Sequence, residues 1–549
     1  MEFKKNQIVE LYIDDIGNEG EGIGHIDGYA LFLKDAVIGD KVRAKIIKTK
    51  KNYGFARVEE VIEASKDRVS PRCSKARQCG GCTLQHLAYE KQLEYKFNKV
   101  KNCLERIGGL ENIEEKMEPI LGMEEPFYYR NKAQFPVGYD KEGNLITGFY
   151  AGRTHHIIDC THCMIQHPVN EQILLKVLDY MKKNNITAYD EKTHKGLVRH
   201  IVTRVGFKTG EIMVCLVVNG SKKNLRNLEM LVDSLTEVEG MTSICVNINR
   251  EKTNRILGSK IEEVYGKPYI YDYIGNVKYQ IGPLSFFQVN PTQTKVLYEK
   301  AMEYADLKGE ETVWDLYCGI GTISLFLAQK AKKVYGVEIV KEAIDDARLN
   351  AKMNGFDNAE FFVGKAEEVL PREYEKNGVY ADTIVVDPPR KGCDSKLLET
   401  MVKMAPKRIV YVSCDPATLA RDLKVLSEQG YEVEKVCAVD QFSHSSHVET
   451  VVLLSQQKPD DTIEIDLDLD ELDATSAELK ATYQEIKDYV LKEFGLKVSN
   501  LYISQVKRKC GIDVGENYNL PKSENARVPQ CPKEKEDAIK AALKYFAMI

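Results

Sequence analysis

Between residues 280 and 456 the chain alternates short apolar runs with stretches suited to helices. This alternation predicts parallel strands joined by helices, the pattern of a doubly wound α/β sheet. In such a sheet ligands bind at the carboxyl ends of the strands, so the residues that follow each run are the first candidates for a functional site. The runs that we expect to be strands are 312–317, 333–337, 383–386, 408–412 and 449–454.

The whole chain, at 549 residues, is too long for one hydrophobic core, and we expect several domains. Residues 1–64 contain short alternating runs separated by glycine turns, which favours a small β-barrel. Residues 65–275 indicate an α+β domain with a cysteine cluster, and the doubly wound domain covers 276–456. The acidic stretch 457–474 is typical of a solvated linker, and 475–549 predicts a small helical unit.

Composition limits the class of protein. Hydrophobic residues make up 43% and charged residues 29%, as in ordinary globular proteins. No apolar run reaches the length of a membrane span and the first residues do not resemble a secretion signal, so we expect a cytoplasmic monomer without membrane contacts. In that reducing compartment the 14 cysteines are expected to be metal ligands or catalytic groups rather than disulfides.

The first strand end is a glycine loop. Residues 312–322 read Thr-Val-Trp-Asp-Leu-Tyr-Cys-Gly-Ile-Gly-Thr, and Gly319 lets a ligand approach the backbone closely. The third glycine of the dinucleotide fingerprint is missing. Asp315 suits a cationic amine, and Glu338 at the next strand end can accept both hydroxyls of a ribose. A site for an amine and a ribose, without a site for a phosphate, predicts S-adenosylmethionine rather than NAD. The alternative for each acid is that it only caps the end of its strand.

Two further strand ends carry reactive side chains. Asp387 opens the sequence Asp-Pro-Pro-Arg, in which two prolines keep the backbone extended and hold Asp387 at the edge of the cofactor or substrate. Cys414 stands where the strand 408–412 turns into a helix, within Tyr-Val-Ser-Cys-Asp-Pro. A thiol at this place can be a nucleophile, and the alternative is a small buried hydrophobe.

A thiol beside a methyl donor indicates a substrate atom that needs activation, because amines and hydroxyls accept a methyl group without the help of a thiol. Carbon 5 of uracil is too weak a nucleophile, but a thiolate that adds to carbon 6 turns the ring into an enolate whose carbon 5 can attack. A base must then remove the carbon-5 proton so that the thiol can leave. We predict Cys414 as the nucleophile and Glu449, at the start of the last strand, as the base.

Three cysteines lie within ten residues in Cys73-x5-Cys79-Gly-Gly-Cys82. A C-x2-C pair in a glycine loop suits zinc or an iron–sulfur cluster. Zinc would take His86 as a fourth ligand, whereas a four-iron cluster would take one of the two cysteines in 159–163. The residue types leave the choice of metal open.

Two segments are basic. The stretch from Lys41 to Arg57 holds seven basic residues, no acidic ones and two aromatic side chains, which suits a nucleic-acid surface. A solvated hairpin with core aromatics is the equal alternative. Near the end of the chain, residues 498–511 are consistent with a helix-turn-helix-like pair, or with a helical appendage that serves packing alone.

Taken together, the motifs resemble the RNA uracil-5 methyltransferases, in the branch that has an N-terminal TRAM domain and a four-iron–four-sulfur cluster and that modifies 23S ribosomal RNA. The resemblance covers roughly residues 5–456. It rests on C-x5-C-G-G-C, F-F-Q-x-N, D-L-Y-C-G-x-G, D-P-P-R and S-C-[ND]-P before a helix. Asp415 stands where many members have Asn, and residues 457–549 have no counterpart in the family core.

The resemblance implies a role for each motif. Cys414 would be the nucleophile, Glu449 the base, and the first 64 residues a TRAM barrel that binds RNA. The implied contacts to S-adenosylmethionine are Gln288, Tyr317, Glu338 and Asp387. The implied ligands of the [4Fe-4S] cluster are Cys73, Cys79, Cys82 and Cys163, with Cys163 preferred over Cys160 because it stands in a C-x-[IL] context.

The leading hypothesis is therefore methylation of uridines in 23S ribosomal RNA, with the target base extruded from a folded loop. A tRNA uracil-5 methyltransferase is the alternative within the same class, and the TRAM-like segment with the cysteine cluster favours ribosomal RNA over it. An RNA-binding assembly factor without catalysis is the alternative from another class, and the presence of Cys414, Glu449 and Asp387 argues against it.

Overall fold

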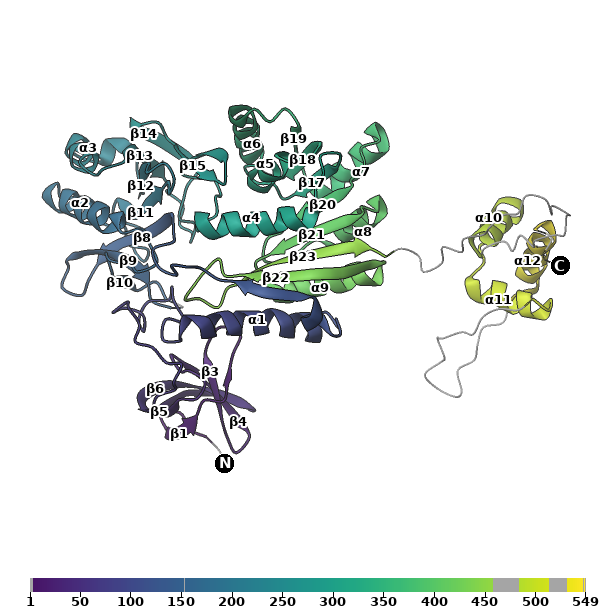
Figure 1. The fold of residues 1–549 in the computed structure, drawn as a ribbon, viewed down its shortest axis with the longest axis horizontal. Helices are drawn as coiled ribbons and strands as arrows, with labels where there is room; N and C mark the ends of the chain where they lie inside the picture. Colours follow the sequence, from purple (N-terminus) through teal and green to yellow (C-terminus); the bar gives the residue numbers. More distant parts are fainter. Residues whose placement is uncertain (1–2, 153, 458–482, 513–530, 547, 549) are drawn as a thin grey trace. The chain divides into compact units, whose positions relative to one another are not determined.

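The computed structural model describes residues 3–152, 154–457, 483–512, 531–546 and 548 (Figure 1). The chain divides into two compact units, 1–460 and 461–549. Within the described ranges no helix combines the length and the apolar character that crossing a lipid bilayer requires.

The N-terminal strands form one six-stranded sheet in the order β1-β5-β6-β4-β3-β2. Its inward side chains, such as Leu31, Val42 and Ile46, are fully buried. Gly24 is required where β3 passes β1, because a Cβ at this position would lie 2.3 Å from the carbonyl oxygen of Tyr12. The sheet therefore curls back on itself, which confirms the predicted N-terminal β domain. Its strands are β1 (Ile8–Tyr12), β2 (Asp15–Ile16), β3 (Gly22–Ile26), β4 (Tyr29–Lys34), β5 (Lys41–Thr49) and β6 (Tyr53–Glu63).

A seven-stranded sheet in the order β10-β9-β8-β11-β12-β13-β14 forms the middle of the chain. Helices α2 (Val169–Lys183) and α3 (Leu228–Thr236) cover one face of this sheet and close a continuous apolar core (Figure 1). A separate hairpin, β15 (Ile270–Ile274) with β16 (Val277–Ile281), follows. The strands of the sheet are β8 (Lys132–Tyr139), β9 (Leu145–Tyr150), β10 (Ile157–Asp159), β11 (Val198–Val205), β12 (Ile212–Val218), β13 (Met241–Ile248) and β14 (Lys260–Gly266).

An eight-stranded sheet in the order β19-β18-β17-β20-β21-β23-β22-β7 completes the first unit. Strands β19 to β21 are parallel, and β23 runs antiparallel to both of its neighbours. Apolar residues of α4 to α6 form the core on one face, and those of α1 and α7 to α9 form the core on the other, which confirms a doubly wound sheet. The five predicted strands are β17 (Thr312–Leu316), β18 (Lys333–Glu338), β20 (Thr383–Val386), β21 (Arg408–Ser413) and β23 (Glu449–Gln456). The helices are α1 (Tyr89–Arg106), α4 (Pro291–Ala305), α5 (Thr322–Ala328), α6 (Lys341–Asn354), α7 (Ala366–Asn377), α8 (Ser395–Met404) and α9 (Pro416–Glu428).

Three strands of this sheet are absent from the sequence prediction: β7 (Met117–Leu121), β19 (Ala359–Val363) and β22 (Tyr431–Val439). Among the described strands β7 pairs only with β22. It contains Pro119, which an edge strand tolerates and which hides the strand in the sequence. Both β7 and α1 fall inside the range 65–275, which we predicted as a central domain, yet they belong to the eight-stranded sheet and its covering helices.

In the described part of the second unit, three helices pack around a small apolar core: α10 (Tyr483–Phe494), α11 (Asn500–Lys509) and α12 (Lys533–Tyr545). Residues 498–511, for which a pair of helices was one interpretation, hold a single helix that ends near Gly511, whose φ is +79°. Apart from residue 457, the predicted acidic linker lies outside the described residues.

Candidate active site

A cleft of about 870 Å³ opens at the carboxyl ends of the parallel strands, where ligands of such sheets bind. Strands β17 and β18 and the start of β23 contribute residues that line it, and so do the residues that directly follow β20 and β21. All eight residues that the sequence assigns to catalysis or to S-adenosylmethionine line this one cleft: Gln288, Asp315, Tyr317, Gly319, Glu338, Asp387, Cys414 and Glu449.

The glycine loop leaves β17 through a backbone that is left-handed at Tyr317, Gly319 and Gly321, with φ of +73°, +55° and +81°. The N–H groups of Tyr317 and Cys318 both donate to the carbonyl of Val337 at 3.0 Å, which ties the loop to β18. Apart from Gly319 and its two chain neighbours, no described residue has an atom within 4 Å of the position of a Cβ on Gly319, so a ligand can reach the backbone there.

Asp315 and Glu338 stand on either side of this loop. Asp315 is fully buried, and the hydroxyl of Ser324 donates to its Oδ2 at 2.5 Å. Its Oδ1 has no hydrogen-bond partner among the described residues, which leaves an acceptor available to a ligand. Burial raises the pKa of Asp315 to about 7. Glu338 Oε1 accepts the N–H of Val340 at 2.9 Å, and the carboxyl is only partly buried.

The predicted nucleophile and base come together through strand register. Ser413 at the end of β21 pairs with Thr450 of β23, and the two strands are antiparallel. Cys414 follows Ser413 and Glu449 precedes Thr450, so both residues lie at the same end of the sheet. Asp415 then caps α9 by accepting the N–H groups of Ala417 and Thr418, which confirms the predicted turn from strand to helix.

Burial and neighbouring carboxyls disfavour the charged forms here. Burial, then Glu449 and Asp387, raise the pKa of Cys414 to about 11, and Arg390 opposes the rise. Burial and the charge of Asp387 raise the pKa of Glu449 to about 8. Burial and the charge of Asp315 raise the pKa of Asp387 to about 7. A cationic ligand placed among these carboxyls would lower all three carboxyl pKa values.

Several residues of the cleft escaped the sequence analysis. Tyr298 on α4 lies in its floor, with its hydroxyl 2.9 Å from Thr322 Oγ1. Phe286, Phe442 and His447 add aromatic walls, and the rings of the last two meet edge to face at 6.2 Å. His447 could have been found, because it lies two residues before Glu449 and alternate residues of an extended chain share a side.

A second, smaller cavity of about 200 Å³ gathers the other predicted thiols. It is lined by Cys73, Cys79, Cys82, Cys160 and Cys163, whereas His86 is not among its lining residues and instead faces Asp35. Burial raises the pKa of Cys82 to about 12 and that of Cys163 to about 11. Within the described residues no three His, Cys, Asp or Glu side chains gather closely enough to hold a single metal ion.

The two candidate fourth ligands differ in their hydrogen bonds. The Cys160 thiol donates to the carbonyl of His162 at 3.2 Å. At Cys163 the backbone N–H groups of Ile165 and Gln166 lower the pKa, but burial outweighs them and raises it to about 11. The choice of Cys163 over Cys160 stays a prediction.

The basic N-terminal hairpin presents an aromatic group. The rings of Phe32, Tyr53 and Phe55 meet at centroid distances of 5.7–5.8 Å, and Tyr53 is 40% exposed. Lys48 pairs with Phe55 across β5 and β6. Partly exposed rings beside lysines are what single-stranded nucleic acid binds.

Comparison with known proteins decides the family. Residues 88–457 match the model of the tRNA (uracil-5-)-methyltransferase family, and residues 2–58 match the TRAM domain. The chain belongs to the tRNA (uracil-5-)-methyltransferase family. As a family member it is an RNA uracil-C5 methyltransferase that depends on S-adenosylmethionine and carries a TRAM domain.

Similar proteins agree with this assignment. An uncharacterized RNA methyltransferase of Clostridium tetani is 53% identical over 453 residues, which is 82% of this chain and 97% of the relative, and one of Halalkalibacterium halodurans is 52% identical over the same shares. The crystal structure of the Pyrococcus abyssi tRNA (uracil-54, C5)-methyltransferase with S-adenosyl-L-homocysteine is similar with a TM-score of 0.66 and 30% identity. The matched region covers 81% of this chain and 100% of the Pyrococcus abyssi chain.

Proposed function

We propose that this methyltransferase modifies carbon 5 of specific uridines in 23S ribosomal RNA through a covalent bond between Cys414 and uracil carbon 6. The observation that carries the proposal is the pairing of β21 with β23, which brings Cys414 and Glu449 into the cleft that Asp387 also lines. Cys414 and Glu449 are the two groups that addition to carbon 6 and proton removal from carbon 5 require.

The cleft also suits S-adenosylmethionine. The amine would lie near the free Oδ1 of Asp315, the ribose hydroxyls would reach Glu338, and Gly319 leaves room for close approach. Gln288, Tyr317 and Asp387 would complete the contacts. When bound, S-adenosylmethionine supplies an electrophilic methyl group, and its positive charge would make ionisation of the nearby carboxyls easier.

The residues divide the reaction into two steps. The Cys414 thiolate would bond to carbon 6 of uracil, and the electron pair freed from the double bond between carbons 5 and 6 would form the bond to the methyl group. The bond between that methyl group and the sulfonium sulfur would break, and S-adenosylhomocysteine would be the leaving group. Glu449 then takes the proton from carbon 5, the bond from carbon 6 to sulfur breaks, and the thiolate is restored. A base with a pKa of about 8 is well matched to proton transfer near neutral pH.

We also propose that Cys73, Cys79, Cys82 and Cys163 hold a [4Fe-4S] cluster. Support comes from a cavity of about 200 Å³ that is lined by all four of these cysteines together with Cys160. The N–H of Gly81 lies 3.4 Å from Cys79 Sγ, and such contacts stabilise cluster thiolates. Because methyl transfer needs no electron, we assign this cluster a structural or RNA-docking role.

A second candidate substrate is tRNA, which the similarity to the Pyrococcus abyssi enzyme favours. Mapping 5-methyluridine in ribosomal and transfer RNA from cells with and without this gene separates the two. Loss of the modification from 23S RNA alone supports our proposal, and loss from tRNA alone overturns it in favour of the second candidate. Purified protein that releases no tritium from any 5-tritiated RNA would favour a non-catalytic RNA-binding factor.

A further inference from the structure

The segment that joins β22 to β23, residues 440–447, forms one side of the cleft. We refer to it as the 440–447 loop. It supplies Phe442 and His447 to the cleft wall, and Glu449 follows two residues after it. Any change in the path of this loop would therefore move both an aromatic wall and the predicted base.

The loop begins at a buried ion pair with α1. Lys96 Nζ lies 2.5 Å from Asp440 Oδ1 and 2.9 Å from the carbonyl oxygen of Phe442, and both charged side chains are fully buried. The hydroxyl of Tyr89, also on α1, donates to Asp440 Oδ2 at 2.7 Å and accepts the N–H of Met123. Replacing such a pair by apolar side chains is often neutral for stability, so its presence here points to control of geometry.

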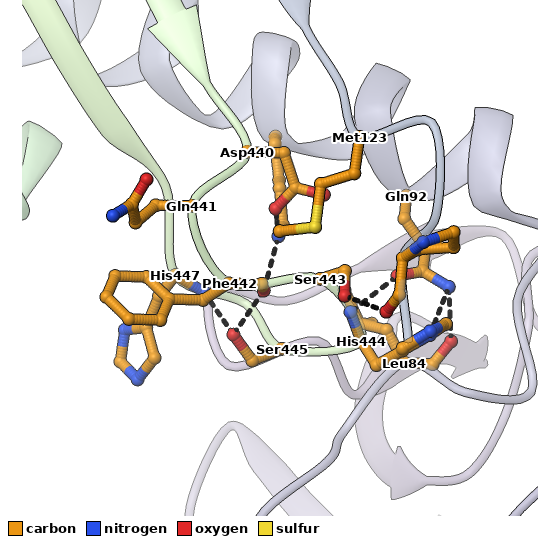
Figure 2. A network of polar contacts seen from close by, with 12 residues as sticks. Leu84, Gln92, Met123, Asp440, Gln441, Phe442, Ser443, His444, Ser445 and His447 are labelled. Carbon is orange, nitrogen blue, oxygen red and sulfur yellow. Dashed lines mark hydrogen bonds and ion pairs between the residues drawn. The ribbon is translucent and has the colours of Figure 1, made fainter. Parts of the chain in front are cut away.

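The middle of the loop, at His444, is bound by residues of α1 and of the segment that follows Cys82 (Figure 2). Gln92 accepts the backbone N–H of His444 at 2.9 Å, and its amide donates to the carbonyls of Leu84 and Leu87. The N–H groups of Thr83 and Leu84 in turn donate to the carbonyl of His444 at 2.8 and 3.0 Å. Since Thr83 directly follows Cys82, these bonds connect the cysteine cavity to the loop.

The other side of the loop is bound to the start of α4. Asn290 Nδ2 donates to the carbonyl of Gln441 at 3.1 Å, and Gln293 Nε2 donates to the carbonyl of Asp440 at 3.2 Å. The amide of Gln441 reaches Thr294 Oγ1 at 2.7 Å. Consecutive residues of the loop are thus fixed from two directions, mostly through directed bonds to its backbone.

We propose that Tyr89, Gln92 and Lys96 are positioning residues of the methyl-transfer site, which act through the 440–447 loop to place Glu449 for proton removal from carbon 5. The inference rests on the proposed function. It also gives a role to the segment that follows Cys82. Because Thr83 and Leu84 hold the carbonyl of His444, the 440–447 loop keeps its conformation only while that segment is ordered. A loop that shifts would slow the second step more than the first and leave RNA bonded to Cys414.

A matched pair of variants on α1 tests this. Tyr89→Phe removes only the hydroxyl that holds Asp440, and Tyr95→Phe removes a hydroxyl of the same helix that instead reaches the carbonyls of Gly17 and Asn18. For Tyr89→Phe we expect kcat to fall about tenfold, which is only part of the roughly 10²–10⁴-fold that a positioned base contributes, because the variant displaces the base without removing it. RNA–protein adduct that resists denaturant should accumulate, and affinity for S-adenosylhomocysteine should be unchanged. For Tyr95→Phe we expect wild-type kcat and no adduct.

Hydrogen–deuterium exchange provides a readout that needs no activity. Exchange in 440–449 should quicken in Tyr89→Phe and stay at the wild-type rate in Tyr95→Phe, with the glycine loop 315–322 unchanged in both. Equal exchange and equal kcat in the two variants overturn the proposal, as does a loss of S-adenosylhomocysteine binding in parallel with kcat. If wild-type protein methylates no RNA, the proposed function fails, while selective exchange in 440–449 would still report the link from α1 to the loop.

Discussion

The large cleft around Cys414 and the small cavity around Cys82 and Cys163 both bury thiols, but different side chains surround the thiols in the two places. Burial raises the pKa of Cys414 in the large cleft and of Cys82 and Cys163 in the small cavity. Around Cys414 stand carboxyls and Arg390, whereas the described lining of the small cavity contains five cysteines, apolar side chains, two glutamines and Arg130 but no carboxylate. Burial alone therefore does not define the chemistry of a cysteine. Neighbours that can move protons suit a nucleophile, and a ring of further thiols suits a metal cluster.

Removing the thiol of the cleft should have the largest effect. We expect Cys414→Ala to reduce tritium release from 5-tritiated uridine in RNA by about 10³-fold or more, because carbon 5 then stays unactivated. Cys318→Ala is the control, since Cys318 lines the same cleft without a predicted role. Retained release in Cys414→Ala would remove Cys414 as the nucleophile.

Removing the base should leave the first step intact. For Glu449→Gln we expect turnover to fall by about 10²–10⁴, the usual contribution of a general base. Adduct between the RNA and Cys414 should accumulate on denaturing gels, because carbon 6 cannot release sulfur until carbon 5 loses its proton. Slow turnover without any adduct would show that Glu449 acts before the covalent bond forms.

In the large cleft a single thiol is expected to react, whereas in the small cavity several thiols are expected to bind one metal cluster together. Anaerobically purified wild-type protein should be brown with about four irons per chain. Cys82→Ser should lose most of this iron, and Cys160→Ser should keep it, because the Cys160 thiol already donates to a carbonyl. A colourless protein with one zinc per chain would contradict the cluster assignment.

The smallest effect concerns stability against pH. The pKa of Glu449 is raised from 4.5 to about 8, so below pH 4.5 the carboxyl is protonated in both folded and unfolded states and costs nothing. As the pH rises from 4.5 to 8, the unfolded state ionises first and the folded state loses stability. Glu449→Gln should match the wild type at pH 4 and exceed it at pH 8 by on the order of a few kcal/mol. Thermal unfolding at several pH values tests this, and a constant difference would contradict it.

Sequence reasoning located the cleft residues well because their signals are local. Asp387, Cys414 and Glu449 each stand at the end of an apolar run, and the ends of strands in one sheet meet. It gave no sign that α1 buries a charged side chain among its apolar ones. The buried face of α1 includes Lys96, whose partner Asp440 lies 344 residues away. A polar residue buried by so distant a partner has no signature in its own segment.

The position of β7 at the edge of the eight-stranded sheet has a consequence for how the chain is made. Residues 117–121 leave the ribosome early, but β22, the strand they pair with, spans 431–439 and emerges roughly 300 residues later. At about 5–20 residues per second this interval is tens of seconds. The nascent chain must keep a short strand unpaired for that time, and the proline and glutamate in β7 are suited to protect it from pairing with the wrong partner.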